Sequence, residues 1–206
     1  MTRSILFATL LPALSFSAVS LPAAVLADCP TAADLPGGIV VTDIDAATET
    51  FYPLTPGVIR SEYRGAEGEG SQSFLGQGVY WLQYIAVEND ELIYDTRLTN
   101  AYPMKPVDMP LPKPGGAWNT QSATLEETGY IRKGAQSTQF GTMTRLTIGA
   151  CGYDMILVTI EYLHDGYQEM VHYFPDLGIG LLAGTANDGE EMILTTFVSI
   201  QAANEN

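Results

Sequence analysis

The chain has 206 residues, of which 9 are Lys or Arg and 24 are Asp or Glu, so its formal net charge is −15. A surface with this charge repels polyanions, which argues against nucleic acid and against an anionic membrane surface as partners. Hydrophobic residues make up 46% of the chain and charged residues only 16%, enough apolar material for one packed core. At this length we expect one domain.

The first 27 residues have the pattern of a secretory signal peptide. Arg3 supplies a positive charge, and the stretch 5–26 that follows is apolar and uncharged. It ends in Val25-Leu26-Ala27, a sequence suited to signal peptidase, so we expect cleavage before Asp28. The sequence therefore predicts a protein exported to the periplasm or beyond the cell. After removal of the signal, no apolar run is long enough to span a membrane.

Two other interpretations of this N-terminus remain open. The uncharged stretch is long enough for a retained membrane anchor, although Pro12 and Pro22 and the small-residue ending favour removal. Lipid attachment at Cys29 requires a small residue before the cysteine, and Asp28 stands at that position.

The mature chain has two cysteines, Cys29 and Cys151, and exported proteins usually oxidise their thiols. We therefore predict a disulfide between them. The bond would close a loop of about 120 residues, which corresponds to about 4 to 5 kcal/mol of stabilisation before any strain is subtracted. A reactive thiol is the alternative, but the chain has no Cys-x-x-Cys sequence.

Short segments rich in β-branched and aromatic residues alternate with tight turns along the mature chain. His164-Asp165-Gly166 and Asn187-Asp188-Gly189 are typical hairpin turns. Only Thr31 to Leu35 favours a helical turn or two, and 122–127 is ambiguous. The expected fold is all-β, one domain over 28–206 forming a single curved antiparallel meander sheet or partial barrel. The predicted strands are 39–42, 49–52, 58–63, 79–87, 92–98, 139–148, 153–163, 167–174, 179–183 and 192–200.

The segment 100–116 breaks this pattern with five prolines, which remove backbone donors and exclude a central strand. We expect it to be an arm that covers the sheet; a flap over the open face and a domain linker are the alternatives. The side chains of the arm that we expect to be buried against the sheet are Tyr102, Met104, Val107, Met109 and Leu111.

Aromatic residues gather around the middle hairpin and the arm, and they are the best candidates for a binding surface. In a curved sheet, one face of this set would line the concavity. The alternative is that they form the core of the domain. The candidate ligand-facing residues are Tyr80, Trp81, Tyr84, Tyr94, Tyr102 and Trp118.

The chain has only two histidines after the signal, and they form the alternative candidate site. His164 lies in a predicted turn and His172 in the strand that follows, so a tight turn would bring the two histidines within reach of each other. Asp154, Glu161 and Glu169 are the carboxylates nearby in the sequence, but neither spacing nor motif selects them. The alternative is an exposed turn histidine and a packed strand histidine. No His-Glu-x-x-His or Gly-x-Ser-x-Gly sequence occurs, and the glycine-rich stretch 68–73 is interpreted as a hairpin end. The sequence thus predicts no cofactor and identifies no catalytic or metal residue.

Tyr173-Phe174-Pro175-Asp176-Leu177-Gly178-Ile179-Gly180-Leu181-Leu182 resembles the late strands of exported bacterial curved-sheet proteins of the TapB type. The resemblance covers 120–200 and extends remotely to half-barrel lipoprotein carriers, which hold acyl chains on a concave sheet. It implies a bacterial, non-catalytic sheet with a concave face and supplies no catalytic residues.

Two functional hypotheses follow. The first is a non-enzymatic exported binding or envelope-associated protein, whose partner is an apolar ligand or an envelope protein. The second is a metal-dependent or acid/base hydrolase that uses His164, His172 and nearby carboxylates.

Overall fold

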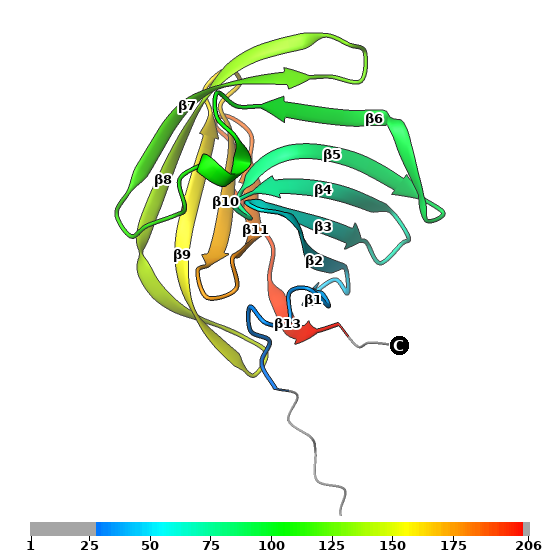
Figure 1. Ribbon diagram of the computed structural model, residues 1–206, viewed down its shortest axis with the longest axis vertical. Helices are drawn as coiled ribbons and strands as arrows, with labels where there is room; N and C mark the ends of the chain where they lie inside the picture. The colour runs from blue at the N-terminus through cyan, green and yellow to red at the C-terminus, as the bar shows by residue number, and fades with distance from the viewer. Residues whose placement is uncertain (1–27, 204–206) are drawn as a thin grey trace, which may run out of the picture.

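The computed structural model describes residues 28–203, so the signal peptide predicted at 1–27 and the residues 204–206 lie outside the described chain. The described residues form one antiparallel sheet of thirteen strands, and no helix among them is long and apolar enough to cross a membrane. Their one helical element is the short 3-10 turn η1 (Pro106–Asp108). The all-β prediction is confirmed, and the sheet is curved without closing into a barrel (Figure 1).

The strands follow one another through the sheet in chain order, except the last, which pairs with the first. They are β1 (Ile39–Asp43), β2 (Thr48–Thr55), β3 (Val58–Arg64), β4 (Gly70–Gly76), β5 (Tyr80–Glu88), β6 (Glu91–Ala101), β7 (Ala117–Leu125), β8 (Ile131–Ile148), β9 (Cys151–Tyr162), β10 (Tyr167–Phe174), β11 (Ile179–Ala186), β12 (Ile193–Leu194) and β13 (Phe197–Ala202).

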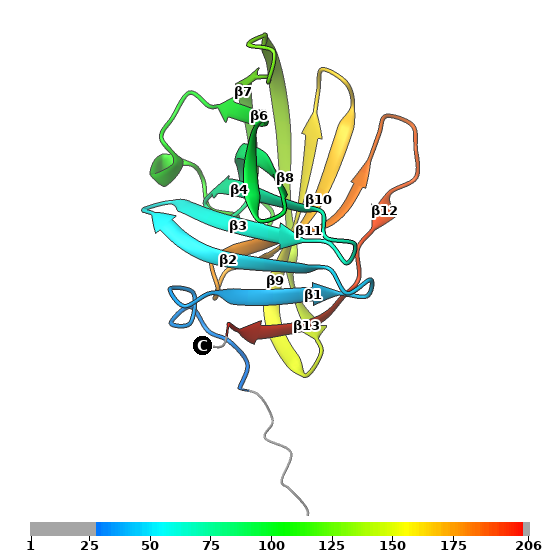
Figure 2. The ribbon, with the colours of Figure 1, turned by 90° about the vertical axis from the view of Figure 1, so that its right-hand side faces the viewer.

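The sheet bends back on itself, so that β1, β2, β3 and β13 cross over the strands from β8 to β11 (Figure 2). A sheet without α-helices has to cover its own apolar face in this way. Two groups of buried side chains result. The first joins β1, β2 and β13 to β9, β10 and β11 and includes Ile39, Phe51, Tyr153, Phe174, Leu181 and Ile200. The second joins β5 and the arm to β8, β9 and β10 and includes Tyr80, Met109, Phe140, Ile156, Val158 and Tyr173.

The predicted strand 192–200 is two strands that belong to opposite edges of the sheet. β12 pairs with β11, whereas β13 pairs with β1. Between them, the amide of Thr195 donates to the carbonyl of Ala183 at 2.9 Å and the carbonyl of Thr196 accepts from the amide of Ile44 at 2.9 Å. The single-strand prediction was wrong because the strand pattern does not reveal which neighbour each residue pairs with.

Two weakly patterned stretches are also strands. The glycine-rich stretch 68–73 contains the start of β4, and the ambiguous stretch 122–127 contains the end of β7. Their small and polar residues have low strand propensity, so pairing with β3, β5 and β8 determines their conformation.

One half of the folded-over sheet consists of β1 to β6 with β13, and the other of β7 to β12. The backbones of the two halves meet at the β4–β5 and β10–β11 turns. A Cβ atom on Gly78 would lie 2.4 Å from the carbonyl oxygen of Gly178, and one on Gly180 would lie 2.7 Å from the carbonyl oxygen of Gly78. Gly78 also has a φ of +72°, a conformation that residues with a side chain rarely adopt. At this contact there is no room for a side chain on Gly78 or Gly180.

The proline-rich segment is an arm packed on the sheet, but it buries fewer side chains than expected. The hydroxyl of Tyr80 donates to the carbonyl of Pro110 at 2.7 Å, and the side-chain amide of Gln77 donates to the carbonyl of Pro106 at 2.9 Å. Met109 is buried in the second core. Tyr102 is half-buried, whereas Met104, Val107 and Leu111 are exposed; the expectation for these three was wrong because hydrogen bonds to the arm's backbone and one buried methionine hold it in place.

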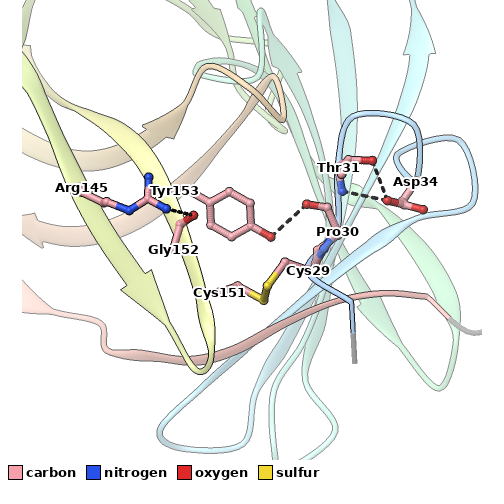
Figure 3. Close-up of a disulfide and its surroundings, with 8 residues drawn as sticks. All are labelled: Cys29, Pro30, Thr31, Asp34, Arg145, Cys151, Gly152 and Tyr153. Atoms are coloured by element: carbon pink, nitrogen blue, oxygen red, sulfur yellow. Dashed lines mark hydrogen bonds between the residues drawn. A yellow bond between two sulfur atoms is a disulfide. The ribbon is translucent and has the colours of Figure 1, made fainter. Parts of the chain in front are cut away.

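The predicted disulfide between Cys29 and Cys151 is confirmed (Figure 3). Beside it, the hydroxyl of Tyr153 donates to the carbonyl of Pro30 at 2.9 Å. These two bonds fasten the N-terminal segment to the β8–β9 turn. A disulfide of this kind is typical of proteins exported to an oxidising compartment.

Replacing both cysteines by alanine is expected to lower the free energy of unfolding by about 2 to 5 kcal/mol, because the unfolded chain loses its cross-link. Urea unfolding followed by circular dichroism measures the change. Dithiothreitol should lower the urea midpoint of the native protein and leave that of the variant unaltered. Equal midpoints for the native protein and the variant in the absence of reductant would contradict the expectation.

Gly78→Ala is expected to destabilise the protein by about 2 kcal/mol more than Gly129→Ala. Both glycines have positive φ, but a Cβ on Gly129 meets nothing within 4 Å, so the difference isolates the contact with Gly178. Thermal unfolding of the two variants in one buffer gives the comparison. Equal destabilisation would show that the two turns do not touch.

Candidate ligand cavity

A cavity of about 560 Å³ lies between the two halves of the sheet, beside the contact at Gly78. Its walls come from β1 to β6 and β13 on one side and from β10, β11 and the segment between β12 and β13 on the other. Apolar and aromatic side chains make up much of the surface. The residues on the walls are Val41, Asp43, Ala47, Thr48, Glu49, Tyr63, Ser71, Ser73, Leu75, Gly78, Val79, Trp81, Tyr84, Leu98, Tyr167, Glu169, Val171, Gly180, Leu182, Thr195 and Phe197.

Strand alternation and one bulge decide which side chains reach the cavity. On β10, Tyr167, Glu169 and Val171 share a face because successive side chains alternate. On β5, Trp81 and Tyr84 would lie on opposite faces of a regular strand, yet both line the cavity. The pairing with β4 shifts by one residue between them, which is a β-bulge, and such bulges re-aim side chains.

Glu49 on β2 is a half-buried residue whose carboxyl group lies at the cavity wall. The hydroxyl of Ser61 on β3 donates to its Oε1 atom. Burial raises the pKa of Glu49 to about 7, and the hydrogen bond from Ser61 opposes part of that rise. Tyr63 lies opposite Glu49 in the β2–β3 register. Its own pKa is raised by burial first and then by nearby carboxylates, which include Glu69, Asp43 and Glu49.

Glu169 on β10 is the corresponding carboxyl of the other wall. The hydroxyl of Tyr162 on β9 donates to its Oε2 atom at 3.1 Å. Burial raises the pKa of Glu169 to about 7, again partly opposed by its hydrogen bond. Burial and the carboxyl of Glu169 also raise the pKa of Tyr162, of Tyr102 and of Tyr167, so these hydroxyls stay protonated at neutral pH.

The charged groups of the cavity are all acidic. Asp43, Glu49 and Glu169 line it, and no Lys, Arg or His does so among the described residues. Asp43 is engaged in the β1–β2 turn, where one carboxyl oxygen accepts from the amides of Asp45 and Ala47, each at 2.9 Å. The turn thus already uses the carboxyl of Asp43 for two hydrogen bonds, whereas Glu49 and Glu169 each accept one from the described residues.

The structure separates the six candidate aromatics into three groups. Trp81 and Tyr84 line the cavity, with ring centroids 6.2 Å apart. Tyr80, Tyr102 and Trp118 pack together in the second core, where the ring of Trp118 lies 4.7 Å from Tyr80 and 5.8 Å from Tyr102. The remaining residue, Tyr94 on β6, is 63% exposed.

The two histidines are not brought together. The imidazole of His164, in the β9–β10 turn, contacts Arg132, and its Nε2 atom lies 2.8 Å from the carboxylate of Asp165. His172 lies five residues beyond the start of β10, about 17 Å along the strand. Its ring is half-buried 6.4 Å from Phe197, and burial lowers its pKa.

The carboxylates considered as partners of the histidines are also dispersed. Asp154 pairs with Arg145 at 3.3 Å. Glu161 lies opposite Gln168 in the β9–β10 register, so it faces away from Glu169. In the described chain, no group of three or more His, Cys, Asp or Glu side chains is placed to hold a metal ion.

Glu49 was not predicted as a site residue, and Glu169 was considered only as a possible partner of the two histidines. The sequence pattern could have indicated Glu169, because it shares one face of its strand with Tyr167, Val171 and Tyr173. A lone carboxylate in such an inward-facing row marks a buried charge. Glu49 gave no such signal, because its short predicted strand had no clear alternation.

These observations define a single curved antiparallel sheet whose concave side holds an acidic, aromatic-lined cavity. Among solved structures, the chain is similar to the hypothetical lipoprotein YmcC from Escherichia coli, with a TM-score of 0.42 and 11% sequence identity over 79% of this chain and 83% of that chain. No protein family matches the chain. The comparison with curated proteins also gave no match.

The contribution of Glu49 and Glu169 to the free energy of unfolding is expected to fall as the pH rises from about 4.5 to 7 and to stay constant at higher pH. The unfolded chain releases these protons near 4.5, whereas the folded protein keeps them to about 7, so the folded state loses its advantage across this interval. The loss is at most about 3 kcal/mol for each carboxyl, less where cavity water screens the charge.

The substitutions Glu49→Gln and Glu169→Gln test this expectation. Each should stabilise the protein at pH 8 relative to the native chain and have little effect at pH 4.5, as measured by urea unfolding. Glu161→Gln, outside the cavity on the neighbouring strand, controls for net charge. A gain at pH 4.5 as large as that at pH 8 would show that the carboxyls are not buried as described.

Proposed function

We propose that this is an exported, non-enzymatic binding protein that holds a small, largely apolar ligand in the cavity between the two halves of its sheet. The observation that carries the proposal is the cavity itself. Its volume of about 560 Å³ lies within the range of small-molecule sites, and its walls combine aromatic and aliphatic side chains with a few polar groups, as such sites do.

Export is supported by the N-terminal pattern and by the disulfide between Cys29 and Cys151. The resemblance of 120–200 to exported curved-sheet proteins of the TapB type remains a prediction, as does an envelope protein as partner. The hydrolase hypothesis has no supporting geometry, because His164 and His172 lie at different places along the β9–β10 hairpin and have no shared carboxylate.

The test uses N-phenyl-1-naphthylamine, an uncharged apolar dye whose fluorescence rises in apolar surroundings. We expect saturable enhancement with the native mature protein. Ser73→Phe, which places a ring in the cavity, should weaken dye binding at least fivefold with an unchanged circular dichroism spectrum.

Gln72→Phe is the matched control, because Gln72 is the neighbouring residue on β4 and faces the opposite side of the strand. It should leave the dye affinity within twofold of the native value. The proposal fails if the native protein gives no saturable signal, or if the two phenylalanine variants bind the dye equally well.

A further inference from the structure

We propose that the ligand of the cavity is an organic cation, a protonated amine attached to an apolar or aromatic body. This inference rests on the proposed function and names the ligand class of the same site. It follows from the position of two carboxyls on opposing walls, from the absence of basic side chains among the described residues of those walls, and from the aromatic rings that line the same space.

The two carboxyls are placed to receive hydrogen bonds from a ligand. Glu49 lies on β2 in one half of the sheet and Glu169 on β10 in the other, and both line the cavity. The hydrogen bonds of the described residues engage Oε1 of Glu49 and Oε2 of Glu169, through Ser61 and Tyr162. Each carboxyl thus keeps one oxygen for a donor, and an ammonium group carries three.

The charge of the walls selects against other ligands. An anionic ligand would meet three acidic side chains and no basic one in the described lining. A neutral apolar ligand would displace water from the two carboxyls and offer no donor to the second oxygen of each, which is costly in an apolar site. A cation compensates them, and buried groups of this kind mark functional sites more often than structural ones.

The aromatic side chains complete the recognition. Trp81 and Tyr84 from β5, Tyr63 from β3 and Tyr167 from β10 line the same space as the carboxyls. Ring faces attract cations, most strongly where water is excluded, and they also pack against an apolar body. Carboxylate and aromatic groups together therefore fit both ends of an amphipathic amine.

Binding of such a cation is coupled to proton release from the two carboxyls. Around Glu49, the other ionisable groups are Asp43 from β1 and Tyr63 from β3. Asp45 and Glu69 are further carboxylates near Tyr63. Around Glu169 they are Tyr162 from β9, Tyr167 from β10 and Tyr102 from the segment after β6. Affinity for an amine should therefore fall as the pH decreases from 8 to 5.5, while affinity for a neutral analogue should not change.

The experiment compares 4-phenylbutylamine, 4-phenylbutan-1-ol and 4-phenylbutyrate by isothermal titration calorimetry with the disulfide-bonded mature protein at pH 7.5. We expect the amine to bind at least tenfold more tightly than the alcohol, and the carboxylate to bind more weakly still. At pH 6, titrations in two buffers of different ionisation enthalpy should show protons released on amine binding.

Glu49→Gln and Glu169→Gln should each weaken amine binding about tenfold and leave alcohol binding within twofold. Glu161→Gln, a carboxyl that faces away from the cavity, should change neither. The probe series on the native protein decides the question even where a variant fails to fold.

Equal affinity for amine and alcohol, or tighter binding of the carboxylate, would overturn the proposal of a cationic ligand. The cavity would remain a ligand site if Ser73→Phe weakens dye binding at least fivefold. If none of the three probes and no dye binds the native protein, the proposed function fails and the cation with it.

Discussion

The contact between two glycine turns determines how this sheet folds over itself. At Gly78 and at Gly178 to Gly180, the two halves approach so closely that backbone meets backbone. The final segment reinforces this arrangement, since β12 and β13 pair with opposite edges of the sheet. Elsewhere, side chains pack between the halves as the two cores, and beside the glycine contact they leave a cavity. The disulfide fastens the N-terminal segment to the start of β9 and the arm packs against β5, and the sheet does not close into a barrel.

The cavity has polar groups that a purely structural core would avoid. Glu49 and Glu169 sit among apolar and aromatic side chains, and desolvation raises the pKa of each to about 7. A glutamine of the same shape would cost the fold less at neutral pH. A bulge in β5 likewise disturbs the ladder, and it brings Trp81 and Tyr84 to the same wall. Both features reduce local regularity and both act on the cavity, which is where such departures are expected if the cavity has a function.

The sequence was sufficient for the class of fold and for much of the local structure. Strand alternation and the turn at His164-Asp165-Gly166 located β9 and β10, and the two cysteines that follow the predicted signal peptide gave the disulfide. It was insufficient where long-range pairing decides. The division of 192–200 between two edges, the strand character of β4 and the bulge in β5 depend on neighbours distant in the chain. The candidate site has the same origin, because Glu49 and Glu169 meet one cavity only after the sheet has folded over.

The burial of these two carboxyls is the central claim, and carbon-detected NMR titration of glutamate side chains measures it directly. With resonances assigned through Glu49→Gln and Glu169→Gln, the account predicts that both carboxyl carbons titrate with midpoints near pH 7. Midpoints near 4.5 for both would mean that water surrounds them, and the cavity described here would not exist in the folded protein.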